Sequence, residues 1–292
     1  MLIEIILLII ALIWLSFATY FDIKTQEIPD WLSYSLIIIA IVLKLLHSLT
    51  TKEWSFFYQG LIAGAVFFGI GSLMYYTKQW GGGDAKLLTG LGIAFTNYPK
   101  FLLNFLNPNL NLPFLLILFL NILIAGALYG IIWSFVLAIK DKKHFSLNLK
   151  KILHMKKVKL LEAIVFILTL ALLLIAFFIV QDLKIRLLAL FVGILPLFFL
   201  YLLILVKSIE NMSFINKIPV SKIRIEDQII NDIFYKGKKI YSKKSLGVTK
   251  KQLSLIKKAK IKYVVIKEGI PFVPSFLIGV LISLILGNLI FF

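Results

Sequence analysis

The 292-residue chain contains no cysteine and only three histidines. Without cysteine, disulfides, thiolate metal sites and a cysteine nucleophile are all excluded. The three histidines are scattered, and this distribution does not favour an imidazole metal site. Any catalytic chemistry must therefore use carboxylates, hydroxyls or lysines, and we expect neither a metal ion nor an organic cofactor.

Charged residues are also scarce: they make up 16% of the chain, against 60% hydrophobic residues, and the mean hydropathy is +0.96. This composition excludes a soluble globular domain. The apolar residues form charge-free runs, at 5–21, 31–43, 55–77, 87–99, 101–139, 163–181, 187–206 and 269–292. A helix of about 20 such residues spans the hydrocarbon layer of a bilayer. The sequence predicts an all-α polytopic membrane protein with about eight transmembrane helices.

The limits of these spans follow from charges and helix breakers. Asparagines and prolines interrupt the run 101–139, so a loop is expected before Pro113. We expect a transmembrane core at 1–206, with spans near 2–21, 31–50, 55–77, 85–99, 113–139, 160–181 and 186–206. A soluble segment at 207–268 and a final span at 269–292 complete the predicted organisation.

Acidic residues are few, 14 against 32 lysines and arginines, which gives a net charge of +18. Of the 32 basic residues, 27 lie in the segments 22–30, 78–86, 140–159 and 207–268. Eight alternating spans place these four segments on one side of the membrane, and the positive-inside rule makes that side cytoplasmic. We therefore predict a multi-pass protein of the cell membrane with both termini outside. The basic excess is explained by this topology, so no nucleic-acid partner is expected.

The soluble segment 207–268 shows the signals of a small α+β domain. Thr249 and Gln252 form a capping box between the apolar residues Val248 and Leu253, which predicts that a helix starts at Lys250. The run 261–267 is rich in β-branched residues and predicts a strand. Upstream, Gly60, Gly64, Gly69 and Gly71 of the third span are expected to permit close helix packing.

Two aspartates lie at the predicted cytoplasmic ends of spans. Asp22 ends the first span, and Asp84 follows three glycines at the start of the fourth. Taken singly, Asp22 is explained as a solvated charge at a helix end and Asp84 as an N-cap. Together, two carboxylates brought close to one another cannot both ionise cheaply, so one keeps a proton while the other acts as a base. Such a pair can activate water for attack on a carbonyl group.

The motifs around these aspartates resemble the type IV prepilin peptidases, a family of GxGD aspartyl proteases, and most closely the archaeal prepilin and preflagellin (archaellin) peptidases. The resemblance covers nearly the whole chain. It is carried by Asp22 with Ile28 and Pro29 after it, by Gly81, Gly82, Gly83 and Asp84 with Lys86 after them, and by the segment 269–274.

The resemblance implies an aspartic endopeptidase that cleaves the class III signal peptides of prepilin and preflagellin precursors at the cytoplasmic face. Asp22 and Asp84 match the catalytic pair of the family, and Gly81 and Gly83 match its loop glycines, with Gly82 between them. Family members that also N-methylate the new terminus carry an extra cytoplasmic domain, often with cysteine pairs. Only eight residues separate Asp22 from Trp31 in this chain, so peptidase activity alone is expected.

Several neighbouring residues have two interpretations each. Lys86 either orients Asp84 or extends to the lipid phosphates, as lysines near the ends of spans commonly do. Glu27 and Asp30, which flank Ile28 and Pro29, either attract a basic substrate leader or form an ordinary acidic loop.

Three other functions are consistent with parts of the sequence. The first is a proton- or cation-coupled transporter using the same carboxylates, although no acidic residue lies at the centre of a predicted span. The second is a presenilin-like or signal-peptide-peptidase-like GxGD protease, but the Tyr-Asp and Pro-Ala-Leu motifs of that branch are missing. The third is a membrane anchor whose basic soluble segment binds nucleic acid or a filament motor. The sequence predicts neither the oligomeric state nor the particular substrate.

Overall fold

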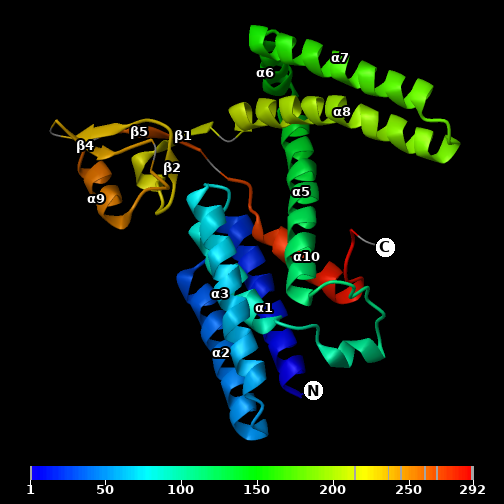
Figure 1. Cartoon of the computed structure of the whole chain (residues 1–292). Coiled ribbons are helices and arrows are strands. Elements are labelled where there is room, and N and C mark those ends of the chain that lie inside the picture. The colour runs from blue at the N-terminus through cyan, green and yellow to red at the C-terminus, as the bar shows by residue number, and fades with distance from the viewer. Residues whose placement is uncertain are drawn as a thin grey trace.

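A computed structural model describes residues 2–213, 215–235, 237–243, 245–259, 261–267 and 269–290 of the chain (Figure 1). Most of these residues are helical. The α-helices are α1 Leu2–Thr25, α2 Asp30–Thr51, α3 Trp54–Tyr76, α4 Gly82–Ala94, α5 Phe114–Lys140, α6 Lys142–Leu153, α7 Lys156–Ile179, α8 Leu183–Ser213, α9 Lys250–Lys258 and α10 Val273–Ile285. Two 3₁₀ helices, η1 Lys100–Asn104 and η2 Val220–Lys222, accompany the strands β1 Ile215–Pro219, β2 Gln228–Ile229, β3 Ile233–Tyr235, β4 Lys238–Tyr241 and β5 Tyr263–Lys267.

Six of the described helices are long and apolar enough to span a membrane: α1, α2, α3, α5, α7 and α8. This confirms a polytopic helical membrane protein with a small sheet-containing region before the last helix. The predicted count of eight spans is not confirmed. Helices α4 and α10, predicted as spans at 85–99 and 269–292, have only 13 residues each. A helix of that length covers about 20 Å, less than the roughly 30 Å of a hydrocarbon layer. Residues 291–292 of the last predicted span lie outside the described residues.

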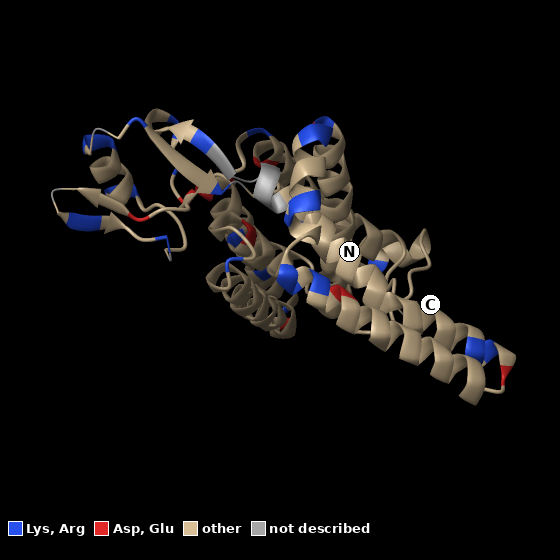
Figure 2. Cartoon of the chain, turned by 90° about the horizontal axis from the view of Figure 1, so that it is seen from above, with Lys and Arg blue, Asp and Glu red and all other residues tan. Residues whose placement is uncertain are grey.

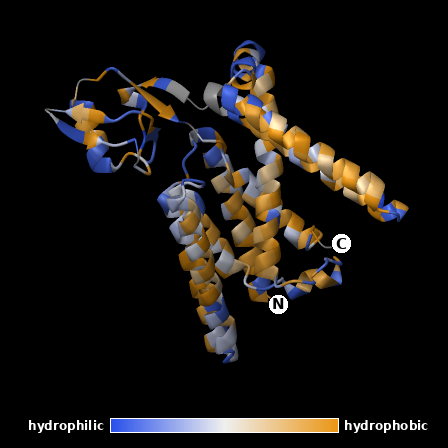
Figure 3. Cartoon of the chain, turned by 45° about the horizontal axis from the view of Figure 1, so that its top comes forward, coloured by the Kyte–Doolittle hydropathy of each residue, from blue (hydrophilic) through white to orange (hydrophobic). Residues whose placement is uncertain are grey.

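Some helices end later than the charge-free runs predict, because a helix can continue through charged residues beyond its apolar part. Helix α1 extends to Thr25 and α8 to Ser213, beyond the predicted ends at 21 and 206. The lysine-rich segment 140–159 contains α6, whose N-cap Asp141 accepts a hydrogen bond from the backbone N–H of His144. Figure 2 shows lysines and arginines gathered on the small domain and at helix ends, and Figure 3 shows the apolar character along the long helices.

The buried face of α1 leads directly to Asp22. Its buried residues recur every three or four positions, which is the spacing of one helical face, and they are Leu7, Ala11, Leu15, Ala18 and Asp22. The apolar stripe thus ends in a carboxylate. Asp22 is only 7% exposed, although it lies near the end of its helix.

Helix α4 is the centre of the bundle and packs chiefly against α2 and α3. After its first turn nearly every residue is buried. Gly71 of α3 permits close approach, because a Cβ there would lie 2.9 Å from the Cα of Ala85, and Gly64 likewise faces Ile93. Gly60 instead faces the Lys44 side chain, and a Cβ on Gly69 would meet nothing within 4 Å, so the packing role predicted for Gly69 is wrong.

Helix α10 fills the space beside α1 and α5. Gly279 packs against the backbone of Ile122 in α5, and the amide of Asn121 donates hydrogen bonds to the Ser283 hydroxyl at 2.9 Å and to the Gly287 carbonyl at 2.7 Å. These contacts hold the middle and the end of α10 against α5, and its first residue, Val273, lies next to the end of α1.

The small domain contains a three-stranded antiparallel sheet in the order β1-β5-β2 and a β3-β4 hairpin. The predicted helix start at Lys250 is confirmed, with Thr249 and Gln252 forming the capping box. The predicted strand is β5, whose Val264 and Ile266 are buried while Tyr263 and Lys267 are exposed. The apolar core of the small domain is formed by Val220, Ile223, Ile229, Ile233, Tyr241, Val248, Ile256, Val264 and Ile266.

Figure 1 shows the small domain, the α1–α2 connection and the C-terminal end of α5 at one end of the molecule, with the N-terminus at the other. The α7–α8 hairpin extends away from the bundle, and most of its apolar side chains are exposed. The connection between α1 and α2 therefore lies beside the small domain, and this is where the candidate site is found.

Candidate active site

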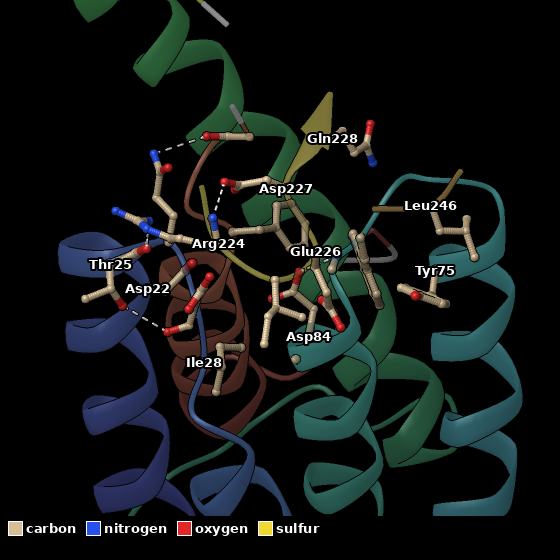
Figure 4. Close-up of a pocket in the computed structure, with 18 of the residues that line it drawn as sticks. Asp22, Thr25, Ile28, Tyr75, Asp84, Arg224, Glu226, Asp227, Gln228 and Leu246 are labelled. Atoms are coloured by element: carbon tan, nitrogen blue, oxygen red, sulfur yellow. Dashed lines mark hydrogen bonds between the residues drawn. The ribbon is translucent and has the colours of Figure 1, made fainter. Parts of the chain in front are cut away.

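A cavity of about 780 Å³ lies between the helix bundle and the small domain. Its lower wall comes from the end of α1, the α1–α2 connection and the start of α4, and its roof comes from residues of the small domain such as Arg224 and Glu226. Asp22 and Asp84 both line it, one from α1 and the other from α4 (Figure 4). The fold thus brings together two carboxylates that are 62 positions apart in the sequence.

Asp22 is held by the start of α10. Its Oδ2 accepts a hydrogen bond of 2.8 Å from the backbone N–H of Val273. The carboxylate is therefore fixed by a segment from the other end of the chain. That segment, 269–274, is also one of the three motifs that carry the family resemblance.

Asp84 lies in the first turn of α4, which is not one of the six candidate spans. Its Oδ2 accepts a 2.9 Å hydrogen bond from the backbone N–H of Gly81. The N-cap of α4 is Gly81 and Asp84 occupies N3, so the interpretation of Asp84 as an N-cap is wrong. Burial and, secondarily, the neighbouring Asp22 carboxylate raise the pKa of Asp84 from 3.8 to about 7.

The loop glycines pack against the α1–α2 connection and the small domain. A Cβ on Gly83 would lie 2.9 Å from the Cβ of Ile28, so glycine is required for this approach. A Cβ on Gly82 would lie 2.9 Å from the Oε1 of Glu226. Pro29 lies beside Ile28 as the N-cap of α2.

The Nζ of Lys86 is bound to the Oδ1 of Asp30 at 2.6 Å and also lies over the ring of Tyr34. The structure shows no contact of this ammonium with Asp84 among the described interactions. Glu27 lines the cavity, and its carboxylate has no hydrogen-bond or ion-pair partner among the described residues. Partial burial of this carboxylate raises the pKa of Glu27, and the nearby Arg224 guanidinium opposes this shift.

Two features of the site were not predicted from the sequence: the Val273 N–H on Asp22, and the pair Arg224 and Glu226 in the roof of the cavity. Glu226 and Asp227 are adjacent acids in a strongly basic domain, and that is the only sequence signal that singles them out. Trp80 packs against Phe272 and Phe276.

The chemistry of the site is that of carboxylates. Among the described residues, no group of three His, Cys, Asp or Glu side chains is arranged to hold a metal ion. A carboxyl group that keeps its proton near neutral pH can polarise a carbonyl, while an ionised partner can take a proton from water.

The fold and the cavity define a helical membrane protein with a two-aspartate site at one end of its bundle. Residues 9–131 match the type IV leader peptidase family. Residues 9–131 thus match the domain of a peptidase family, and this match confirms the resemblance inferred from the motifs.

Two archaeal relatives support this assignment. The prepilin peptidase EppA of Methanothermobacter thermautotrophicus is 22% identical over an alignment that covers 99% of this chain and 96% of the relative. The preflagellin peptidase of Methanocaldococcus jannaschii is 30% identical over 90 residues, which covers 31% of this chain and 38% of the relative. No solved structure matches the chain.

Proposed function

We propose that this protein is an aspartic endopeptidase that cleaves the class III signal peptides of prepilin or preflagellin precursors without N-methylating the product. The observation that carries the proposal is the cavity that Asp22 of α1 and Asp84 of α4 both line. The family match supports peptide-bond hydrolysis, and the names of the two relatives support precursors of this kind as substrates.

In the proposed mechanism, Asp84 enters the reaction protonated and Asp22 enters it ionised. Asp22 takes a proton from a water molecule as that water attacks the scissile carbonyl carbon, while Asp84 donates a hydrogen bond to the carbonyl oxygen. The tetrahedral intermediate then collapses, the C–N bond breaks, and the leaving amine receives a proton from the pair. The raised pKa of Asp84 supports this assignment of acid and base.

The membrane arrangement follows the charge distribution. We propose that the end of the molecule carrying the cavity and the small domain faces the cytoplasm in the cell membrane, and that both termini lie outside. Because the chain has no cysteine, single cysteines can test this. An impermeant maleimide should label Thr51→Cys in intact cells, and Lys24→Cys only after lysis. Labelling in the reverse order would contradict the orientation.

The activity is tested with a purified precursor reporter that carries a short Lys-Arg leader, a Gly before the cut and an apolar helix of about 20 residues. The expected product lacks the leader, and its new N-terminus carries no methyl group, as read by mass spectrometry. A methylated product would contradict a peptidase-only enzyme. A set of such reporters left intact, together with proton-coupled ion uptake in liposomes, would favour the transporter instead.

A further inference from the structure

One turn of the small domain contacts both helices that carry the aspartates. In the turn 224–227, between η2 and β2, the Arg224 guanidinium donates a hydrogen bond to the Thr25 carbonyl at the end of α1. The Oε2 of Glu226 accepts one of 3.3 Å from the Gly82 N–H at the start of α4. Thr25 is three residues from Asp22, and Gly82 is two residues from Asp84. Figure 4 shows Arg224 and Glu226 beside the two aspartates.

The charges of these two side chains match the helix ends that they meet. The last carbonyls of a helix have no intrahelical partner and carry partial negative charge, while the first N–H groups carry partial positive charge. Arg224 meets the carbonyl end of α1, and Glu226 meets the N–H end of α4. Exchanging the two charges would place each against a helix end of its own sign.

The backbone of the turn is held from within the small domain. The Oδ2 of Asp227 accepts a hydrogen bond of 2.7 Å from the Arg224 N–H. The N–H of Glu226 donates to the Val248 carbonyl at 2.8 Å, and the Val248 N–H donates to the Asp227 carbonyl at 3.0 Å. Gly247 lies so close that a Cβ on it would be 2.6 Å from the Cα of Glu226.

Glu226 also has a backbone conformation that is rare for its residue type. Its φ is +71°, in the left-handed region that a residue with a Cβ adopts at a cost. Such conformations persist where the surrounding contacts hold them, and they are concentrated at functional sites. Here the conformation directs the carboxylate to Gly82, whose missing side chain leaves room for it.

We propose that the turn 224–227 is a bracket that sets the spacing between the two aspartates, with Arg224 as the positioning residue for α1 and Glu226 as the positioning residue for α4. This inference rests on the proposed peptidase function. Through the bracket, the small domain takes part in catalysis, because the contacts of Arg224 and Glu226 set the positions of the end of α1 and the start of α4. Neither side chain needs to touch the substrate for this role.

The test compares Glu226→Ala, Glu226→Gln and Arg224→Ala with the wild type in the reporter assay. Asp232→Asn is the matched control, because Asp232 is a carboxylate of the same domain that pairs with Lys239 at 2.7 Å and does not line the cavity. A misplacement of about 1 Å in a catalytic group costs about 100-fold in rate. We therefore expect Glu226→Ala and Arg224→Ala to lower kcat by about 10- to 100-fold at nearly unchanged KM, with Asp232→Asn unaffected.

The pH profile separates positioning from simple structural support. The charged groups that act on Asp84 are the carboxylates of Asp22 and Glu226, and both raise its pKa. Glu226→Gln keeps a hydrogen-bond acceptor for Gly82 but removes the charge. We expect a smaller loss of kcat than in Glu226→Ala, with the alkaline limb of the profile displaced to lower pH. The double exchange Arg224→Glu with Glu226→Arg should be at least as inactive as the two alanine variants combined.

A second readout does not need cleavage. In the wild type, the bracket protects the Gly82 amide, so hydrogen–deuterium exchange in the segment 77–86 should be faster in Glu226→Ala and unchanged in Asp232→Asn. If the wild type cuts no reporter, the proposed function fails, and the exchange comparison still decides whether the bracket exists. The proposal would be overturned if Glu226→Ala kept the wild-type kcat, pH profile and hydrogen–deuterium exchange. It would also be overturned if Asp232→Asn lost as much kcat as Glu226→Ala.

Discussion

Val273 and Asp22 are 251 positions apart in the chain, yet a backbone N–H of the first and a carboxylate oxygen of the second form a 2.8 Å hydrogen bond. The bond joins the start of α10 to the end of α1. It means that the first aspartate of the site is oriented by the last helix, so the family motif at 269–274 has a structural reason to accompany Asp22.

This bond predicts a difference between two substitutions of Asp22. Asp22→Asn keeps an oxygen that accepts from Val273, so its thermal stability in detergent should stay close to the wild type. Asp22→Ala leaves a buried N–H without a partner, which costs about 1–3 kcal/mol. We therefore expect a lower melting temperature for Asp22→Ala than for Asp22→Asn. Equal melting temperatures would mean that the bond contributes nothing to folding.

The raised pKa of Asp84 predicts how the cleavage rate depends on pH. With a pKa of about 7, Asp84 is protonated in acid and loses its proton as the pH rises through that value. If Asp84 is the acid, kcat should be lost on the alkaline side, and about a tenth of the molecules should remain active at pH 8. The rate is measured between about pH 5 and 9, with melting curves at each pH to detect unfolding. A rate that is still constant well above pH 7 would remove Asp84 from this role.

Two glycines of α3 form a matched pair for a packing test. A Cβ at Gly71 would lie 2.9 Å from the Cα of Ala85, whereas a Cβ at Gly69 would meet nothing within 4 Å. Gly71→Ala should therefore destabilise the bundle by about 1–3 kcal/mol through overpacking. Gly69→Ala should be neutral or slightly stabilising, because alanine favours the helix. Thermal unfolding of both variants in the same detergent checks the order, and the reverse order would contradict the α3–α4 packing.

The sequence left two interpretations open for Glu27 and Asp30, attraction of a basic leader or an ordinary acidic loop, and the structure distinguishes the two residues. Both residues line the cavity, but Asp30 is paired with Lys86, whereas the Glu27 carboxylate has no ion-pair partner among the described residues. We expect Glu27→Gln to raise KM up to about 5-fold for a reporter with a Lys-Arg leader, the size of one exposed charge pair. Asp30→Asn should change KM less. A reporter whose leader lysines and arginines are replaced by glutamine provides the control, since Glu27→Gln should not affect it.

The sequence predicts local structure well where the signal lies within a few residues. The capping box of Thr249 and Gln252 predicts the start of α9, and the β-branched residues of the run 261–267 predict β5. The prediction from sequence fails where the length of a helix depends on its packing against other helices. The run 87–99 contains no charged residue, but α4 ends at Ala94, and a helix this short is stable because it packs against α2 and α3.

The residues of the candidate site also differ in how far the sequence predicts them. Asp22 and Asp84 stand out because each is an acid at the edge of an apolar run, and the glycines before Asp84 mark its loop. Arg224 and Glu226 lie in a surface turn of a basic domain, where a charge has no special meaning in the sequence. Their contacts with Thr25 and Gly82 depend on how the small domain docks on the bundle, and no local pattern encodes that docking.

In the proposed function, Asp22 and Asp84 act as one catalytic pair. The most direct measurement is the size of the reporter after incubation with the wild type, Asp22→Asn and Asp84→Asn, each shown by its melting temperature to be folded. We expect a shortened product with the wild type and none with either variant. Cleavage at the wild-type rate by a folded Asp22→Asn or Asp84→Asn variant would contradict it.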